Sequence, residues 1–291
     1  MTFTLTSDTG ALRTVTDAVG QDEPDASLFW SSLDSPVCVA GDWHGDARWA
    51  TAALDVAAEH SRLLLHVGDL GIWPGHLGRQ YLDVLQSVLA SNDQLLLLTP
   101  GSHEDYDQLE ELVPVPELPA GFGFLRQAPR VIVLARGTRF TLGGRSVLSI
   151  GGANSIDRRL RVPRINWWAR EQISDQDVEA ACAGGAVEIM LSHDCPTGSL
   201  EPEYDETWLD EDLAYARGSG QQLLEVMHRV QPQLNVFGRH HRHLDAPVRF
   251  APPQGPAYQS QQVCLDMNGS QANLMLLDPA TYQRRLLPVP A

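Results

Sequence analysis

The fold is decided by three short runs in the first third of the chain: PVCVAGD (36–42), LLLHVGD (63–69) and LLLLTPG (95–101). Each run is apolar and ends at a glycine or an acidic turn, which is typical of a β-strand buried on both faces. Between the runs lie two stretches with apolar residues at helical spacing, DARWATAALDVAAEH (46–60) and GRQYLDVLQSVLA (78–90). This alternation of strands and helices predicts a largely parallel α/β layer.

The pattern changes after a proline-rich connection, VPVPELP (113–119). Three apolar runs within 131–152, VIVLARG, RFTLGG and RSVLSIGG, leave no room for helices and predict a second, mixed sheet. The rest of the chain predicts helices near 173–182 and 220–230, and strands at 188–194, 234–238, 263–269 and 273–278. No internal repeat or flexible linker divides it, so we expect one domain over residues 34–291.

Residues 1–33 have neither a basic start nor a continuous apolar stretch, so they do not resemble a signal peptide. We expect an N-terminal extension that is partly disordered. No apolar run approaches the length of about 18 residues that spans a membrane. The four cysteines show no paired or metal-type spacing, which is typical of buried or idle thiols in a reducing compartment. These features together predict a soluble, cytoplasmic protein without a membrane partner.

The composition excludes several kinds of function. The 291 residues contain 21 basic residues, all of them arginine, against 37 acidic ones, for a net charge of −16. Because the chain has no lysine, it cannot form a Schiff base or use a phosphate-loop lysine. The acidic balance also argues against nucleic acid as a partner, since that binding needs clustered positive charge.

Polar residues follow each of the strong strands. They are Asp42-Trp43-His44, Asp69, Ser102-His103-Glu104, His193-Asp194 and Arg239-His240-His241-Arg242-His243. In an open α/β sheet, the ligand site lies at the carboxyl ends of the strands. A single motif of this kind is usually a turn or a cap, but five in succession favour a metal site. Mixed aspartate and histidine ligands suit Mn, Fe or Zn better than Ca or Mg.

This ordered set resembles the calcineurin-like metallophosphoesterase family, whose pattern is D-x-H, G-D, G-N-H-[DE], H and G-H-x-H. The matching residues here are Asp42-x-His44, Gly68-Asp69, Gly101-Ser102-His103-Glu104, His193 and Gly238-Arg239-His240-His241. The resemblance covers roughly residues 36–280. It implies an α/β fold of four layers, an αββα sandwich in which two mixed sheets are flanked by helices.

The resemblance also implies roles for individual residues. The first metal would be held by Asp42, His44, Asp69 and His241. Asp69 would bridge to a second metal, held by His193 and by the residue at the position of the family's asparagine, which is Ser102 here. A metal-bound hydroxide would attack phosphorus, and His103 would donate a proton to the leaving oxygen or stabilise charge on the phosphoryl group. Two ions about 3.5–4 Å apart hold the attacking and leaving oxygens together in such sites.

Two positions depart from the family pattern, and both would belong to the second metal. Ser102 replaces the asparagine, and Arg239 replaces the first histidine of G-H-x-H. A serine hydroxyl is a poorer metal ligand, and an arginine cannot coordinate a cation. We therefore expect one firmly bound ion and a second site that is weak, empty or partly replaced by the Arg239 guanidinium, which is a good phosphate clamp.

The register of the last motif has two alternatives. If residues 238–243 are extended, Arg239, His241 and His243 face one side of the strand. Taking Gly238 as the motif glycine makes His241 the second histidine. A slip of two residues makes His241 the first histidine and His243 the second. His241 is a ligand in both alternatives, and we prefer the first because it retains the glycine.

The leading hypothesis is a metal-dependent phosphoesterase that acts on a phosphomonoester or small phosphodiester, with His103, Asp69 and Arg239 in catalysis. The alternative is a catalytically weak or inactive family member that serves as a binding or scaffolding subunit. The segment EPEYDETWLDED (201–212) has seven acidic residues. It would form a negative rim that disfavours polyanions, tolerates a small ester and offers a surface to a protein partner.

Other polar and aromatic residues have weaker signals. Four tryptophans, Trp43, Trp73, Trp167 and Trp168, are candidates for stacking on a substrate ring, although the adjacent pair cannot both face inward from a strand. Asn154 is expected to lie in a turn, with substrate contact as the alternative. Asp46 is expected to cap a helix.

Overall fold

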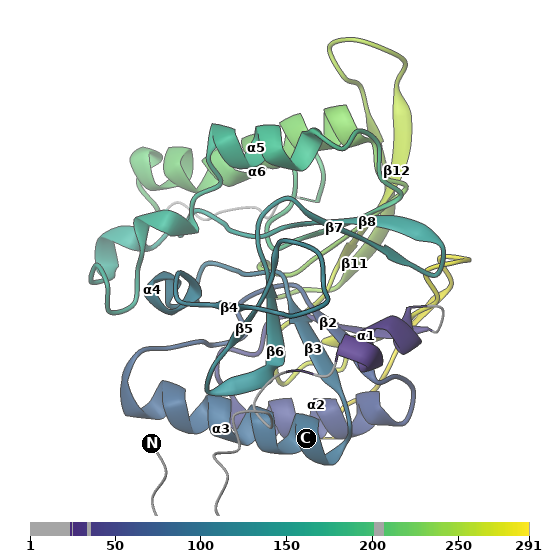
Figure 1. Ribbon diagram of the computed structural model, residues 1–291. Coiled ribbons are helices and arrows are strands. Elements are labelled where there is room, and N and C mark those ends of the chain that lie inside the picture. Colours follow the sequence, from purple (N-terminus) through teal and green to yellow (C-terminus); the bar gives the residue numbers. More distant parts are fainter. Residues whose placement is uncertain (1–23, 25, 34–35, 201–206, 291) are drawn as a thin grey trace, which may run out of the picture.

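Two β-sheets lie face to face in the middle of the molecule, and helices cover their outer faces (Figure 1). The computed structural model describes residues 24, 26–33, 36–200 and 207–290. Helices α5 and α6 form one outer layer, and α2 and α3 form the other (Figure 1). The predicted αββα sandwich is therefore confirmed.

The larger sheet contains the three strands predicted from the first third of the chain. Its strand order is β14 (Arg284–Leu286), β13 (Leu274–Leu277), β1 (Val37–Ala40), β2 (Leu63–His66), β3 (Leu95–Leu98), β6 (Ala128–Leu134), β5 (Phe122–Leu125) and β4 (Val113–Pro114). The central four strands, β1, β2, β3 and β6, are parallel, and the outer strands are antiparallel. Helices α2 (Ala47–Ala58) and α3 (Gly75–Ser91) connect the parallel strands, as their amphipathic sequences predict.

The smaller sheet is also mixed. Its strand order is β11 (Leu244–Phe250), β12 (Tyr258–Cys264), β10 (Leu234–Phe237), β9 (Ile189–Ser192), β8 (Arg145–Ile150) and β7 (Thr138–Leu142). Strands β8, β9, β10 and β12 are parallel. Helices α5 (Asp175–Cys182) and α6 (Asp210–Val230) pack on its outer face through a separate apolar cluster.

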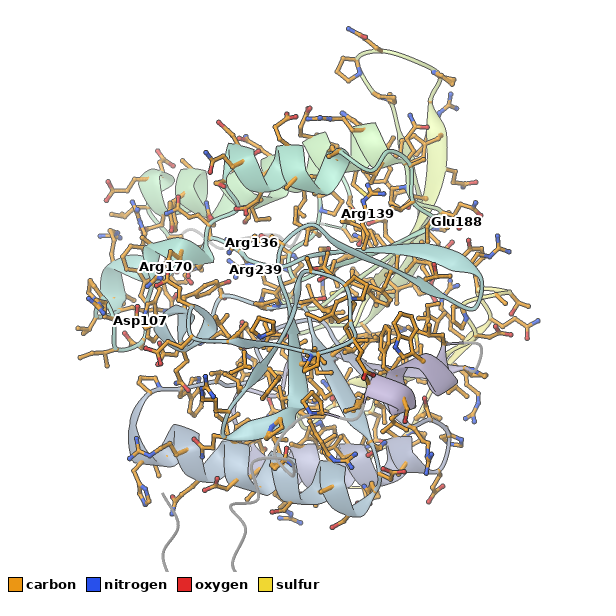
Figure 2. All side chains as sticks on the ribbon, in the orientation of Figure 1. Asp107, Arg136, Arg139, Arg170, Glu188 and Arg239 are labelled. Carbon is orange, nitrogen blue, oxygen red and sulfur yellow. The ribbon has the colours of Figure 1, made fainter. Side chains whose placement is uncertain are left out.

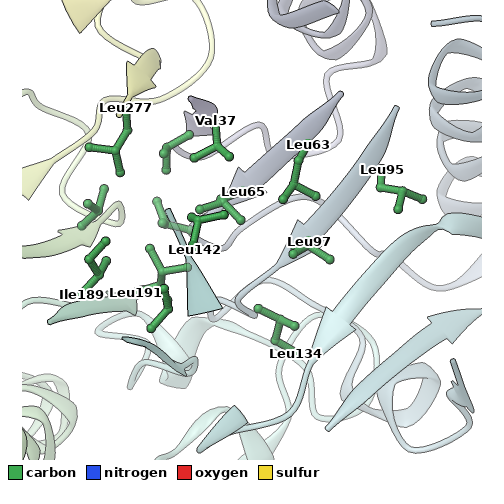
Figure 3. Close-up of a cluster of buried hydrophobic side chains, with 14 of the residues drawn as sticks. Val37, Leu63, Leu65, Leu95, Leu97, Leu134, Leu142, Ile189, Leu191 and Leu277 are labelled. Atoms are coloured by element: carbon green, nitrogen blue, oxygen red, sulfur yellow. The ribbon is translucent and has the colours of Figure 1, made fainter. Parts of the chain in front are cut away.

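Alternation along the strands separates the layers of the core. Val37 and Val39 of β1 join the cluster between the two sheets, whereas Cys38 and Ala40 point toward α2 and α3. Leucines of the neighbouring strands alternate in the same way, so the leucine runs that looked uniform in sequence serve two clusters. Figure 3 shows Leu65 and Leu97 of the larger sheet in one cluster with Ile189 and Leu191 of the smaller.

Some boundaries differ from the sequence predictions. The 131–152 region does not form one sheet, because β6 joins the larger sheet while β7 and β8 join the smaller. The helix predicted at 220–230 begins ten residues earlier, at Asp210. The strand predicted at 263–269 ends at Cys264, and the loop that follows donates hydrogen bonds from Asn268 N and Asn273 Nδ2 to the Asp42 carbonyl.

Part of the predicted N-terminal extension belongs to the core. Helix α1 (Ala26–Ser32) buries Leu28 and Phe29 in the cluster between the sheets, and the Phe29 ring meets the Phe122 ring edge to face. Residues 1–23, where we expect partial disorder, lie outside the described residues. Among the described helices, none combines the length and the apolar character needed to cross a membrane.

Candidate metal centre

Five loops that follow parallel strands converge at one end of the sandwich. They follow β1, β2, β3, β9 and β10, and they bring together Asp42, His44, Asp69, Ser102, His103, His193, Arg239 and His241. Four of these residues adopt the left-handed backbone conformation: His44, Asp69, Arg239 and His241, with φ between 47° and 64°. This conformation is costly for residues other than glycine, and it is retained where the surrounding contacts determine it.

Asp42 lies at the centre of one group of candidate ligands. Its Oδ2 is 3.2 Å from His241 Nε2 and 3.9 Å from His44 Nε2. The His44 ring is oriented by Asn268, whose Oδ1 lies 3.3 Å from His44 Nδ1. Ligand atoms of Asp42, His44 and His241 all lie within 4.8 Å of one another, so one ion can reach all three.

Asp69 lies between this group and His193. Its Oδ1 is 3.2 Å from His193 Nε2, and its Oδ2 is 3.7 Å from His44 Nε2. The backbone N–H groups of Ser102 and His103 donate to Oδ1 over 2.7 and 2.8 Å, which fixes the carboxylate. The His193 Nδ1–H donates to the Val67 carbonyl over 2.8 Å, so Nε2 faces the site with its lone pair available for a cation.

Buried atoms without hydrogen-bond partners test whether this donor set fits a metal. Asp42 Oδ2 and His193 Nε2 are both buried, and neither atom has a hydrogen bond of regular geometry. A Cβ atom on Gly68 would lie 2.3 Å from His193 Nδ1, and one on Gly238 would lie 2.2 Å from Asp42 Oδ1. The glycines leave room for these two side chains, and the buried atoms without regular hydrogen bonds fit a divalent cation of the Mn, Fe or Zn type.

The charge balance of the cluster also favours a cation. Burial lowers the pKa of His44 and His193, but hydrogen bonds and charges from Asp69, together with the Asp42 charge, outweigh it and raise each pKa to about 9. Burial raises the pKa of Asp69, but the neighbouring histidines His193, His103 and His44 hold it well below its usual range. Two buried carboxylates thus keep nearby imidazoles protonated, and a bound divalent ion would take the place of those protons.

The two residues that depart from the family pattern contact each other. Arg239 Nη1 donates to Ser102 Oγ over 3.0 Å, and Nη2 donates to the Asn154 carbonyl. Arg239 Nε lies 3.4 Å from Asp194 Oδ2, so the guanidinium is held on three sides. Figure 2 shows Arg239 near the centre of the molecule, between the layer of α5 and α6 and the layer of α2 and α3.

The last motif adopts the register that keeps Gly238. Residues 239–243 are not extended, in contrast to the sequence expectation, because Arg239 and His241 both have positive φ. His241 reaches Asp42, whereas His243 Nδ1 lies 2.9 Å from the Cys264 carbonyl and is absent from the candidate ligand groups of the described residues. These positions favour the register that keeps Gly238, because His241 and not His243 lies beside Asp42.

His103 has a partner that the sequence did not indicate. Arg161 Nη2 lies 2.7 Å from His103 Nε2, and because a guanidinium only donates, the histidine nitrogen accepts. Burial lowers the pKa of His103, and the Arg161 charge lowers it further against the raising effect of Asp69. His103 Nε2 therefore carries no proton in this arrangement. The segment RRLR (158–161) has no spacing that could have singled out Arg161.

Another buried carboxylate, Glu104, organises the loops around the site. Its Oε1 accepts from Leu70 N over 2.7 Å, and its Oε2 accepts from Gly101 N. Burial and the Asp69 charge raise the pKa of Glu104 to about 7. Glu104 thus connects the loop after β2 to the loop after β3 through hydrogen bonds.

Candidate residues with weaker sequence signals have defined places as well. Asp46 caps α2 by accepting from Trp49 N over 3.0 Å, as predicted. Trp43 is fully buried and packs edge-on against His66, so it cannot stack on a substrate. In the acidic segment, residues 201–206 lie outside the described residues, while Asp212 is buried and paired with Arg159 over 2.5 Å.

Comparisons with known proteins agree with this geometry. Residues 35–238 match the family model of the calcineurin-like phosphoesterases, so the chain belongs to that family. The crystal structure of TT1561 of Thermus thermophilus is similar with a TM-score of 0.50 at 12% identity, over 88% of this chain and 99% of that one. A second crystal structure is similar with a TM-score of 0.55 at 11% identity over the same shares. These likenesses show the fold. No curated protein is significantly similar to the chain.

Proposed function

We propose that this protein is a metal-dependent phosphatase that hydrolyses a phosphomonoester or small phosphodiester, using one complete metal site beside an arginine. Membership of the family implies metal-dependent phosphoester hydrolysis. The observation that carries the proposal is the convergence of Asp42, His44, Asp69 and His241 beside the largely buried Arg239 guanidinium. A bound divalent ion would supply Lewis acidity and a water of lowered pKa.

Arg239 is the residue we assign to the phosphoryl group. Its side chain is 10% exposed and lines the same cavity as Asp69, Ser102 and His103. A planar guanidinium can donate two parallel hydrogen bonds to phosphoryl oxygens, and its charge offsets that of a phosphate without a second ion. Because Asp194 and the Asn154 carbonyl hold it in place, little side-chain entropy is lost on binding.

Arg161 and His103 act as a pair in this proposal. In the substrate-free arrangement the guanidinium of Arg161 donates to His103 Nε2. An incoming phosphate dianion is a stronger acceptor than a neutral imidazole, so we expect Arg161 to turn onto a phosphoryl oxygen. His103 Nε2 is then released to hold a proton at the position where the leaving oxygen needs one.

Hydrolysis of p-nitrophenyl phosphate and bis(p-nitrophenyl) phosphate tests the proposal, after chelation and reloading with Mn²⁺, Fe²⁺ or Zn²⁺. We expect turnover of at least one ester with Mn²⁺ and a loss of about a hundredfold or more in the Asp42→Asn and Asp69→Asn variants. Glu59→Gln, at the exposed C-terminal end of α2, is the matched control. No turnover with any metal would favour the alternative, a binding or scaffolding member of the family.

We also propose a cellular compartment and a class of partners for this protein. All four cysteines are free and buried, which supports a reducing compartment such as the cytoplasm. The excess of acidic residues supports a small ester over nucleic acid as substrate. Asp210 and Glu211 are exposed, which supports the proposal that the acidic segment 201–212 binds a basic protein partner.

A further inference from the structure

Two cavities meet at His103. The first, of about 250 Å³, contains the polar groups assigned above to the phosphoryl end, among them Asp69, Ser102 and Arg239. The second, of about 480 Å³, extends away from the metal ligands toward the N-terminus of α3. Both are lined by His103, Asp157 and Arg161, so the second cavity adjoins the first at the residue placed beside the leaving oxygen.

The lining of the second cavity is mainly apolar. It includes Trp73, Leu77, Leu160, Ile165 and Trp168. Leu77 is 74% exposed and Leu160 is 78% exposed, and they are among only eight large apolar residues that are exposed in the described part of the chain. Exposed apolar side chains that gather around a concavity indicate a binding site, since scattered ones need no explanation.

The walls of this cavity are held in place by contacts that do not need a ligand. Arg161 Nε pairs with Asp157 Oδ1 over 2.7 Å, and Val162 N donates to Asn166 Oδ1 over 2.6 Å. Arg164 and Arg170 both pair with Asp107, which joins the loop that carries Leu160 to α4 (Tyr106–Leu109). Figure 2 shows Arg170 and Asp107 together at the edge of the molecule.

Trp73 links the cavity to the metal ligands. Its ring lies against Gly45, where an added Cβ would come within 2.9 Å of ring carbon Cζ3, and Gly45 directly follows the candidate ligand His44. The apolar wall of the cavity therefore packs against the loop that carries His44. A preformed apolar cavity loses little entropy on binding, so it can contribute fully to affinity.

We infer that the second cavity, defined by Trp73, Leu77, Leu160, Ile165 and Trp168, is a leaving-group chamber that selects phosphomonoesters of apolar aryl or alkyl alcohols. The inference rests on the proposed function. Hydrolysis breaks the bond between phosphorus and the ester oxygen, a water oxygen takes that place on phosphorus, and the ester oxygen leaves with a proton as the alcohol. With the phosphoryl group between Arg239 and the metal ligands, the ester oxygen lies at His103 and its carbon skeleton enters the chamber.

Two phosphonates that cannot be hydrolysed test the chamber independently of catalysis. Phenylphosphonate and 4-butylphenylphosphonate have the same charged end and differ in four apolar carbons. Calorimetry with the Mn²⁺-loaded full-length protein is expected to show about tenfold or more tighter binding of the butyl compound. Equal affinities would overturn the inference.

Matched variants test whether the chamber residues cause the preference for the butyl compound. Leu160→Asn and Leu77→Asn, both exposed, are expected to remove most of the preference, so that the affinity for the butyl compound falls close to the affinity for phenylphosphonate. Val84→Asn changes another exposed aliphatic residue of α3 that lines neither cavity, and it should keep the full preference. A preference that survives in Leu160→Asn and Leu77→Asn would place the butyl group elsewhere and overturn the inference.

Kinetics with phenyl phosphate and 4-butylphenyl phosphate separates the two proposals, because their leaving groups have nearly the same basicity. We expect a higher kcat/KM for the butyl ester because its KM is lower. If neither ester is hydrolysed while the phosphonate preference holds, the proposed function fails and the chamber stands as a binding site. If both esters are hydrolysed at equal kcat/KM, the chamber fails and the proposed function stands.

Discussion

The Arg239 guanidinium donates a hydrogen bond to the Ser102 hydroxyl over 3.0 Å. These are the two positions at which the sequence departs from the motif pattern on which its resemblance to the family rests. The two departures are thus one structural feature. The Arg239 guanidinium contacts the Ser102 hydroxyl, which replaces a metal ligand of the family pattern. Asp194 and the Asn154 carbonyl also contact this guanidinium. This arrangement supports the proposal that Arg239 takes the place of a second ion beside the phosphoryl group.

This contact predicts the metal content. We expect about one tightly bound ion per wild-type chain, and we expect two in the double variant Ser102→Asn, Arg239→His, which restores the family's ligands. Elemental analysis after dialysis measures the stoichiometry. Each single variant serves as a control and should retain one ion. Two firmly bound equivalents in the wild-type protein would contradict the assignment of Arg239 to the second position.

The raised pKa values of the ligands predict how metal affinity depends on pH. His44, with a pKa of about 9 in the metal-free protein, is protonated at pH 7, and an ion held by Asp42, His44, Asp69 and His241 must displace that proton. Apparent affinity should therefore rise from pH 7 and level off near pH 9, by about tenfold per pH unit for each displaced proton. Mn²⁺ titrations in buffers of different ionisation enthalpy count the protons released. His44→Ala should release one fewer, and affinity that does not change between pH 7 and 9 would refute the prediction.

The contact between Arg161 and His103 predicts a change in the pKa of the histidine. Removing the guanidinium in Arg161→Gln should raise the pKa of His103, because a nearby positive charge no longer opposes the imidazolium. NMR titration of the His103 Cε1 proton in the metal-free protein follows this directly. Arg164→Gln, in the same loop but paired with Asp107, should leave the titration unchanged. An unchanged His103 titration in Arg161→Gln would show that the two groups are not coupled in solution.

We expect Glu171, in the short η2 helix (Ala169–Glu171), to contribute to the stability of the fold. This fully buried carboxylate accepts hydrogen bonds from Ser155 N, Ser155 Oγ, Trp167 Nε1 and Tyr215 OH. Glu171→Ala should lower the free energy of unfolding by about 3 kcal/mol, because buried donors lose their acceptor. Urea unfolding monitored by tryptophan fluorescence measures it. Glu59→Ala at the exposed end of α2 should change stability by no more than about 0.5 kcal/mol, and a similar small change in Glu171→Ala would mean that water satisfies the donors.

Much of the fold could be predicted from sequence because its determinants are local. The apolar runs at 36–42, 63–69 and 95–101 carry their strands, and the intervening helices follow from periodicity. The sequence could not show that β6 and β7, separated by a short turn, enter different sheets. That choice depends on which strand edge each one meets, and β6 pairs with β3, a strand that lies well before it in the chain.

By itself the sequence determined which chemical groups this protein carries and that strand ends would present them, since side-chain type and hydrophobic periodicity are properties of short segments. It also determined that Ser102 and Arg239 break the metal pattern. Only the tertiary structure decided that these two residues contact each other, that His241 and not His243 faces Asp42, and that Arg161 reaches His103. The contact between Arg161 and His103 joins residues 58 positions apart, and the contact between Arg239 and Ser102 joins residues 137 positions apart. No local pattern encodes a contact that exists only once both sheets have packed.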